Sequence, residues 1–395
     1  MFKIFANASI AHIAISNNTG RPKQTILTKK SIAGAVAEIS SWPGYQATPL
    51  HDLDHLAKEL GLSSVSYKDE GGRFGVGSFK ALGAPYAGLR VLQRELSKRL
   101  NRNLELSDVH DAQYSDLKKK ITLVAATDGN HGRSLAWGAQ KFGVPCKIYI
   151  HNHVSKNRAS AIAEFGAEVI RVDGDYDYSV KVCKQEAETN GWFVVSDTSW
   201  EGYSKEPTDV MTGYGLMIKE IHQQLDQSPT HLFVQGGVGG LAAATVAGLY
   251  QIYGDHSPKV IIVEPDLAPC LFESAKNGQA TNVEIAEETL MAGLSCGEPS
   301  VLAWQIIQES VHDFLTIPEV LVAPSMRLLA NPIGLDTGIV AGESAIAGLA
   351  GLIAGCIQPD LKAKLELDHD SRILLIGSEG ATDQKIYDDI IKRRD

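Results

Sequence analysis

The chain has 395 residues, of which 44% are hydrophobic and 21% are charged. A chain of this length and composition can bury a sizeable core, and it is expected to divide into two or three domains. Its formal net charge of −10 argues against a nucleic-acid polyanion as a partner. No apolar run reaches the ~20 residues that a membrane-spanning helix needs, so we expect no membrane partner.

The cysteines and the first residues indicate the compartment. Five cysteines are widely spaced, without a CxxC pair or a Cys/His cluster at zinc spacing, so no metal site is expected. The start, "MFKIFANASIAHIAISNN", holds a mostly apolar dozen after Lys3, but Asn7 and His12 interrupt it. A cleaved signal peptide is therefore not expected. We predict a cytoplasmic protein.

The first segment with chemical character runs from the strand-like "SVSYKDE" (64–70) through a glycine-rich turn to Lys80. Apolar residues then recur at helical intervals, and Ser78 is placed to cap the segment that holds Lys80. Pro85 leaves two possibilities open: one helix that includes it, or a short turn followed by a helix that begins at Pro85. In both, Lys80 lies near a helix start, where the helix dipole and desolvation lower the pKa of its amine. Such an amine is a nucleophile toward carbonyls.

A series of strand-like and helical patterns follows. The strand-like runs lie at 121–127, 144–151, 168–174 and 192–197. Segments with helical spacing separate them, which is typical of βαβ units and predicts a parallel sheet.

A polar turn, "ATDGNHG", ends the first of these strands and contains Asp128, Asn130 and His131. Ligands of open α/β folds bind at the carboxyl ends of parallel strands. Taken alone, Asp128 or Asn130 could cap a helix and His131 could be a buried hydrogen-bonding group. Three such residues in one turn favour a binding site.

A second α/β series occupies the rest of the chain. Its strand-like runs lie at 231–235, 259–265 and 372–377. The two series predict two doubly wound α/β lobes with mainly parallel sheets. We place a large domain at residues 1–82 and 193–395, and a smaller domain at 83–192.

A glycine-rich loop joins the run at 231–235 to an alanine-rich helix. The loop consists of Gly236, Gly237, Val238, Gly239 and Gly240. Backbone amides at a helix N-terminus favour an anion, so the loop is a candidate phosphate cradle. Gly237-x-Gly239-x-x-Ala242 also matches the dinucleotide fingerprint, with Glu264 near the place of the ribose partner. An NAD-dependent oxidoreductase therefore remains an alternative.

The last strand-like run, in "RILLIGSEG", delivers Ser378 and Glu379 to the same kind of sheet edge. Alone, this segment would be an ordinary βα turn with Ser378 as an N-cap.

Together these segments resemble the fold type II pyridoxal phosphate (PLP) enzymes, which include serine and threonine dehydratases, threonine synthase and the tryptophan synthase β chain. The resemblance covers nearly the whole chain. It implies that PLP lies in the cleft between the two lobes and that Lys80, in "S-x-K", binds the PLP aldehyde. It also implies that Asn130 contacts the phenolic oxygen, that the glycine loop holds the phosphate, and that Ser378 faces the pyridine nitrogen.

Four longer motifs are similar to those of one branch of this family, the diaminopropionate ammonia-lyases. They are "KDEGGRFGVGSFKALG", "ATDGNHGRSLAWGAQ", "SDTSWEGY" and "LMAGLSCGEPS". Dehydratases of hydroxy amino acids usually carry serine where this chain has Asp128, and the chain adds Asp197. A carboxylate can hold the second ammonium of a diamino acid, whereas beside a hydroxyl substrate it would be buried unpaired. The neutral Ser378 suits β-elimination.

The expected activity is elimination of D- or L-2,3-diaminopropionate to pyruvate and ammonia by a homodimer. Lys80 is the expected base for an L substrate, Asp128 the base for a D substrate, and Asp197 orients or protonates the leaving amine. A serine, threonine or amino sugar acid dehydratase is the alternative within the family, and a non-catalytic PLP-binding protein is a further one. Cys270 and Cys296 flank the expected entrance, where two unpaired thiols are favoured.

Overall fold

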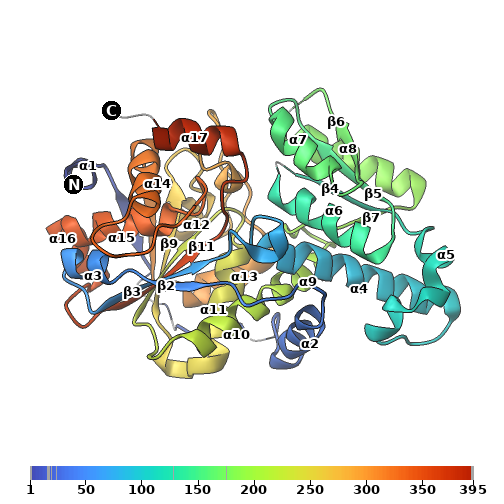
Figure 1. The fold of residues 1–395 in the computed structure, drawn as a ribbon, viewed down its shortest axis with the longest axis horizontal. Helices are drawn as coiled ribbons and strands as arrows, with labels where there is room; N and C mark the ends of the chain where they lie inside the picture. Colours follow the sequence, from blue (N-terminus) through green and yellow to red (C-terminus); the bar gives the residue numbers. More distant parts are fainter. Residues whose placement is uncertain are drawn as a thin grey trace. The chain divides into compact units, whose positions relative to one another are not determined.

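The computed structural model describes residues 2–15, 18, 20–23, 25–127, 129–174 and 176–392. Asp128, one of the predicted site residues, lies outside these described residues. The chain divides into two compact units, whose helices and strands are labelled in Figure 1. Unit 1 consists of Met1–Thr28, Ala47–Gly72 and Met217–Asp395, and unit 2 of Lys29–Gln46 and Arg73–Leu216.

Unit 1 contains a seven-stranded sheet in the order β1-β10-β9-β8-β11-β3-β2. Its strands are β1 (Ala11–Ala14), β2 (Leu50–Asp52), β3 (Ser64–Asp69), β8 (His231–Gln235), β9 (Lys259–Pro265), β10 (Asp313–Ile317) and β11 (Arg372–Gly377). The five inner strands pair in parallel, and the edge strands β1 and β2 run antiparallel to their neighbours. The predicted mainly parallel sheet is confirmed.

Helices cover both faces of this sheet. They are α1 (Lys3–Asn7), α3 (Asp54–Leu60), α11 (Gly240–Tyr253), α12 (Cys270–Asn277), α13 (Val301–Ser310), α14 (Val322–Ala330), α15 (Ala347–Ile357), α16 (Pro359–Leu365) and α17 (Gln384–Lys392). Phe233 of β8 and Val263 of β9 share a buried cluster with Leu349 of α15. Side chains alternate along a strand, and Phe314 of β10 contacts Trp304 of α13, with ring centroids 6.4 Å apart. Unit 1 is therefore doubly wound, as predicted.

Unit 2 contains a four-stranded sheet in the order β6-β5-β4-β7, with every pair parallel. Its strands are β4 (Leu123–Ala126), β5 (Cys146–Ile150), β6 (Glu168–Arg171) and β7 (Phe193–Val194), and its helices are α2 (Lys29–Ser40), α4 (Lys80–Leu100), α5 (Ser115–Lys118), α6 (Asn130–Phe142), α7 (Lys156–Ala163), α8 (Tyr176–Asn190) and α9 (Lys205–Gly213). Tyr149 of β5 packs with Cys183 of α8. On the other side, a Cβ on Gly132 of α6 would stand 2.8 Å from Ile148 of β5. Helices therefore cover both faces here too.

The smaller unit extends beyond the segment 83–192 expected from the sequence. Helix α9 packs along α4, and α2 packs against α9. The contact is close, because a Cβ on Gly213 of α9 would stand 2.4 Å from the carbonyl oxygen of Leu82. This packing joins residues 29–46 and 193–216 to unit 2, which also contains Lys80. Helix α10 (Gly215–Gln224) begins in unit 2 and continues into unit 1.

Helix α4 is continuous through Pro85. Of the two possibilities left open by the sequence, the single helix is therefore the one observed. Pro85 lies in the second turn, where its missing N–H removes one helical hydrogen bond. Helix α6 approaches it closely, since a Cβ on Gly138 would stand 2.7 Å from the Cβ of Pro85. The proline is thus a packing surface for α6 rather than a helix start.

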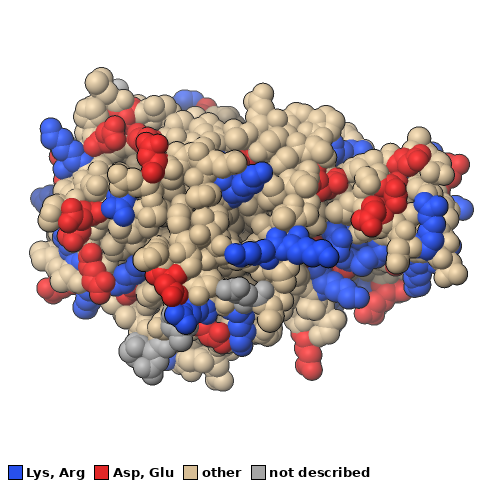
Figure 2. Space-filling view, turned by 90° about the horizontal axis from the view of Figure 1, so that it is seen from below, with Lys and Arg blue, Asp and Glu red and all other residues tan. Residues whose placement is uncertain are grey.

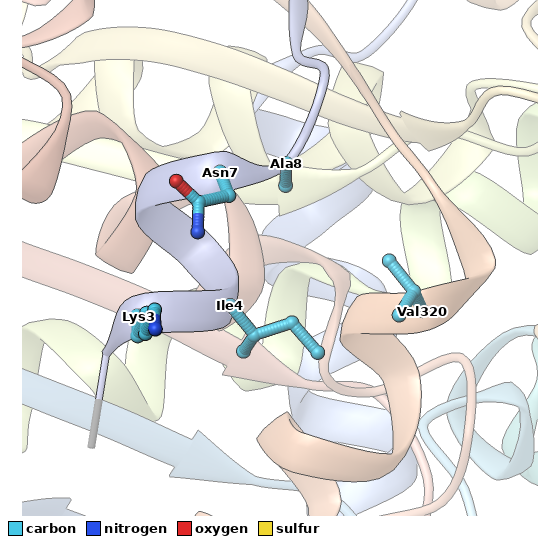
Figure 3. Close-up of a pocket in the computed structure, with 5 residues that line it drawn as sticks. All are labelled: Lys3, Ile4, Asn7, Ala8 and Val320. Carbon is cyan, nitrogen blue, oxygen red and sulfur yellow. The ribbon is translucent and has the colours of Figure 1, made fainter.

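The N-terminal apolar segment belongs to the fold of unit 1. Residues 3–7 form α1, and β1 pairs with β10, where His12 Nε2 lies 2.7 Å from Asp313 Oδ1. Figure 3 shows a pocket beside α1, between Ile4, Ala8 and the exposed side chain of Val320. None of the predicted site residues that the structure describes lines this pocket.

Both signs of charge occur on the surface. Figure 2 shows Lys and Arg side chains gathered near the middle of one face, with Asp and Glu side chains around them. Among the described residues, no helix is both long and apolar enough to span a bilayer.

Candidate active site

Lys80 is the first residue of α4 in unit 2. The turn that precedes it uses left-handed backbone at Gly75 (φ 69°) and Gly77 (φ 102°), which glycine adopts without strain. The expected cap by Ser78 is wrong: its side chain makes no capping bond, and its hydroxyl is buried without a hydrogen-bond partner among the described residues. The helix instead starts with backbone bonds from Ala81 to Ser78 and from Leu82 to Phe79.

The amine of Lys80 donates a hydrogen bond to the carboxylate of Asp197, 117 residues further along the chain. Their side chains are 20% and 18% exposed, so solvent screens this ion pair only partly. Burial opposes the charge of Asp197, but the Lys80 ammonium outweighs it and holds the pKa of that carboxyl well below its ordinary value. Asp197 is therefore anionic, and the Lys80 ammonium is its ion-pair partner.

His131 lies on the other side of the same carboxylate. It is the second residue of α6, its side chain is 5% exposed, and its Nδ1 stands 3.6 Å from Asp197 Oδ2. Its Nε2 lies 2.7 Å from the carbonyl oxygen of Val195. Burial lowers the pKa of His131, an effect that Asp197 opposes and Lys80 reinforces. The sequence placed His131 near a site but did not connect it with Asp197.

Two aromatic rings shape the surroundings of Lys80. Its amine lies 5.2 Å from the centroid of the Phe79 ring, which in turn packs 4.7 Å from that of Tyr214. Burial raises the pKa of the Tyr214 hydroxyl, and that hydroxyl has no hydrogen-bond partner among the described residues. The neutral ring therefore acts as an apolar wall.

The loop that carries Asp197 is held by Tyr203. The Tyr203 hydroxyl donates to the carbonyl oxygen of Val194 (2.9 Å) and accepts from the backbone N–H of Ser196 (3.0 Å). With the bond from His131 to Val195, three successive residues before Asp197 are fixed by side chains. Because β7 is only two residues long, these bonds add to its short pairing with β4 in supporting Asp197.

We expect Tyr203→Phe to lower kcat/KM about 10-fold, because the Ser196 N–H and the Val194 carbonyl lose their common partner. The measurement is steady-state kinetics together with the affinity for PLP, the cofactor that the sequence resemblance implies. We expect the PLP affinity to change by less than about twofold, because among the described residues the Tyr203 hydroxyl bonds to the Asp197 loop. Tyr250→Phe is the matched control, since that hydroxyl is on the exposed surface of unit 1, 3.5 Å from Asp255. Equal rates for the two variants would contradict the positioning role.

Asn130 is the first residue of α6 and is half-buried. The helix approaches β4 and β5 so closely that a Cβ on Gly132 would stand 2.3 Å from the Thr127 side chain. Unit 2 thus brings together Lys80, Asp197 and His131, the residue that follows Asn130 at the start of α6.

The glycine loop of unit 1 connects β8 to α11, which begins at Gly240. Gly237 and Gly239 have left-handed backbone, with φ of 62° and 95°. A Cβ would stand 2.4 Å from Glu264 at Gly236 and 2.8 Å from Ile307 at Gly239. The loop therefore requires glycine for both conformation and space, and its amides at the start of a 14-residue helix suit a phosphate.

Ser378 follows β11, the neighbour of β8 in the sheet. The side-chain amide of Gln235, at the end of β8, donates to the carbonyl oxygens of Ile376 (2.6 Å) and Ala345 (2.9 Å) and lies 3.5 Å from Ser378 Oγ. Parallel pairing thus puts Ser378 beside Gln235, the residue that precedes the glycine loop. Gln235 was missed by the sequence analysis, although its polar side chain at the end of an apolar strand was a signal.

Glu264 caps helix α12, which is a different role from the ribose partner that an NAD site needs. Its carboxylate accepts the backbone N–H groups of Leu271 (3.1 Å) and Phe272 (2.7 Å), and it is completely buried. Cys270 Sγ lies 3.8 Å from the same carboxylate and 3.4 Å from the carbonyl oxygen of Gly237. A Cβ on Gly237 would also stand 3.9 Å from Cys296 Sγ, so both predicted thiols lie beside the glycine loop.

Burial raises the pKa of Glu264 to about 8. A carboxyl that binds its proton more tightly when folded gives stability that is present below its ordinary value of 4.5 and is lost as the pH rises through about 8. We expect the melting temperature of the apo protein to fall as the pH rises from 4.5 to about 8. Glu264→Gln, which mimics the neutral carboxyl, should flatten the fall. Thermal unfolding of both proteins across this range is the measurement, and parallel curves would contradict the assignment.

The chemical groups described above suit the parts of a PLP molecule. The glycine loop suits its phosphate, the Ser378 hydroxyl suits a neutral pyridine nitrogen, and an amine paired with a carboxylate suits its aldehyde. The fold and these groups are those of a PLP-dependent enzyme, and the family described as "Pyridoxal-phosphate dependent enzyme" matches residues 42–379, so the chain belongs to it.

Comparison with known proteins gives the branch of the family. The chain is 39% identical to diaminopropionate ammonia-lyase of Escherichia coli (strain K12) over 358 residues, 88% of each chain. It is 38% identical to the Salmonella typhimurium (strain LT2) enzyme of that name over 359 residues, 88% of this chain and 89% of the relative. The chain belongs to the diaminopropionate ammonia-lyase branch of the PLP-dependent enzymes.

Solved structures agree. The crystal structure of the Escherichia coli enzyme in complex with D-serine has a TM-score of 0.89 and 35% identity, covering 98% of this chain and 97% of that one. A second structure of that enzyme, in complex with an aminoacrylate-PLP azomethine reaction intermediate, gives the same values.

The alternative of an NAD-dependent oxidoreductase is wrong, since the family and the role of Glu264 both oppose it.

Proposed function

We propose that the chain catalyses the PLP-dependent elimination of 2,3-diaminopropionate, with water, to one pyruvate and two ammonia molecules. The observation that carries this proposal is the partly buried ion pair of Lys80 and Asp197. The amine of Lys80 is the group that would bind the PLP aldehyde. A diamino substrate brings a second ammonium, for which the carboxylate of Asp197 is the partner. The names of the relatives support the same substrate.

The residues that the family resemblance names would hold PLP. Lys80 would bind the aldehyde and Asn130 the phenolic oxygen, while residues 236–240 would hold the phosphate and Ser378 would face the pyridine nitrogen. When bound, PLP withdraws electrons from the substrate α-carbon and makes its proton acidic.

The residues of the chain then have distinct tasks. Lys80 Nζ, once uncharged, accepts the α proton of an L substrate. Asp197, because it is anionic, holds the β-ammonium by a charge-assisted hydrogen bond. The β nitrogen leaves as neutral ammonia from its ammonium form, so it needs no added proton. Of the two roles expected for Asp197, orientation is therefore better supported than proton donation.

Asp128 is proposed as the base for the D isomer, whose α proton lies on the opposite face from Lys80. We expect Asp128→Asn to lower kcat for D-2,3-diaminopropionate about 10²-fold and to affect the L isomer less than about threefold, because loss of a general base costs this much only where it accepts the proton. Pyruvate release from each isomer, followed in parallel, tests the division. An equal loss for both isomers would refute the two-base assignment.

The activity itself is tested with the purified protein. We expect bound PLP to give visible absorbance that disappears on borohydride reduction, which also fixes the PLP mass on a peptide with Lys80. A substrate panel then decides the specificity: D- and L-2,3-diaminopropionate, D- and L-serine, and L-threonine. Faster pyruvate release from serine than from diaminopropionate would favour the dehydratase alternative instead.

We also propose a cytoplasmic homodimer. The family is commonly dimeric, and the widely spaced cysteines suit a reducing compartment. Light scattering of the PLP-loaded protein tests the oligomeric state, and fractionation of the source cells tests the location.

A further inference from the structure

We propose that His131 is a second proton site for the Asp197 carboxylate: when Lys80 becomes uncharged, the proton that it gives up is held on Nδ1 of His131. His131 would then be a positioning residue that keeps Asp197 anionic throughout the reaction. The inference deepens the proposed function, on which it rests in assigning Lys80 a change of charge.

The hydrogen bond of His131 to Val195 defines which ring nitrogen carries the hydrogen. A carbonyl oxygen can only accept, so Nε2, at 2.7 Å, is the donor. In the neutral ring Nδ1 therefore has a lone pair. That nitrogen is buried and has no hydrogen-bond partner within the described ranges of the chain. A buried nitrogen base without a donor is a vacant proton site.

The vacant nitrogen faces a carboxylate. Nδ1 stands 3.6 Å from Asp197 Oδ2, which is longer than a hydrogen bond and close for two lone pairs. The same oxygen accepts from Lys80. A proton on Nδ1 would turn this contact into a charge-assisted hydrogen bond. Asp197 Oδ2 thus lies between Lys80 Nζ and His131 Nδ1, and either nitrogen is a cationic partner for it when protonated.

The charges around His131 permit one cation at a time. Among the described groups, Asp197 favours the protonated ring and Lys80 disfavours it. Tyr214, near both Lys80 and Asp197, is neutral. While Lys80 is an ammonium, His131 is neutral. Once Lys80 loses its charge, the repulsion disappears and the attraction remains.

The transfer balances in atoms and charge. The N–H bond of the Lys80 ammonium breaks and an N–H bond forms at His131 Nδ1, with Asp197 Oδ2 as the bridge. Before the transfer the three groups carry +1, −1 and 0, and afterwards they carry 0, −1 and +1. Their sum stays zero, so the step adds no net charge to a partly buried site.

The first test uses the apo protein and needs no substrate. We expect Lys80→Met to raise the pH at which His131 titrates by at least about one unit, since a like charge beside Asp197 is removed. Nitrogen-15 correlation spectra of the ring should show hydrogen on Nε2 alone in the wild type at neutral pH and on both nitrogens in Lys80→Met. Lys147→Met is the matched control, because Lys147 is on β5 and pairs with Glu168. An unchanged titration of His131 in Lys80→Met would overturn the proposal.

The second test uses the PLP-loaded enzyme. His131→Gln can keep a donor for Val195 but has no titratable nitrogen. We expect the acid limb of kcat against pH for the L substrate to move up by about one unit, with PLP still bound. A rate lowered equally at every pH would indicate a structural role and contradict the proposal. Absence of the elimination activity in the wild type would refute the proposed function, but it would leave the titration in the apo protein as a valid test of His131.

Discussion

Lys80→Ala is expected to lower the rate of pyruvate formation by about 10³-fold or more, because one side chain supplies both the attachment of PLP and the base for an L substrate. Asp197 would also lose its ammonium partner. PLP should still bind through the glycine loop and Ser378, but no PLP mass should be found on the protein after borohydride reduction. Stopped-flow absorbance and mass spectrometry measure the two effects.

Lys80→Arg separates the chemical role of the lysine from its ion pair. A guanidinium keeps a cation beside Asp197, so the fold around α4 should be retained, but it remains protonated and forms no covalent bond with an aldehyde. We expect activity as low as that of Lys80→Ala, with a melting temperature near that of the wild type. Retained PLP attachment in either variant would show that another lysine binds the cofactor.

Asp197→Asn is expected to lower kcat/KM for both isomers of 2,3-diaminopropionate by about 10³-fold. The amide keeps the shape of the side chain but leaves a partly buried ammonium without its counterion, and a 10³-fold loss corresponds to about 4 kcal/mol. For serine, whose hydroxyl needs no counterion, we expect a loss of less than about 10-fold, because it loses a hydrogen bond and no charge pair. The ratio of the two kcat/KM values is the decisive measurement.

An equal loss for diaminopropionate and serine would contradict this assignment, because the whole effect would then belong to a step common to both substrates, such as the proton transfer from Lys80 to His131. Glu168→Gln is the matched control. That carboxylate pairs with Lys147 at the surface of unit 2 and is 61% exposed. Removing it should change kcat/KM by less than about twofold, as for most exposed substitutions.

Features that depend on a few consecutive residues could be predicted from the sequence. The glycine loop after β8, the polar turn after β4 and Ser378 after β11 each combine an apolar run with a change of residue type at its end. In a parallel sheet such ends meet at one edge, so the alternation of elements was sufficient to place Ser378 at an edge of this kind, and the family resemblance connected it with residues 236–240. The strands β3, β4, β5, β6, β7, β8, β9 and β11 were predicted from such runs, whereas β1, β2 and β10 were not, and the family resemblance connected the predicted segments.

Features that depend on contacts between distant residues came from the folded chain. Lys80 and Asp197 are 117 positions apart, and nothing local in either segment indicates that they form an ion pair. Glu264 has the spacing of a ribose partner, but burial beside α12 makes it a cap. The edge strands β1 and β2 are short and antiparallel, so they lack the βαβ pattern.

The chemical groups of the site can thus be predicted from short stretches of sequence, because backbone conformation and residue type suffice to make a phosphate loop or a reactive lysine. The protonation states of these groups cannot be predicted in this way, because a pKa depends on burial and on the nearest charges, which are brought together only when the chain folds. Asp197 is anionic because Lys80 lies beside it, and His131 faces them both because α6 packs closely on β5 through Gly132.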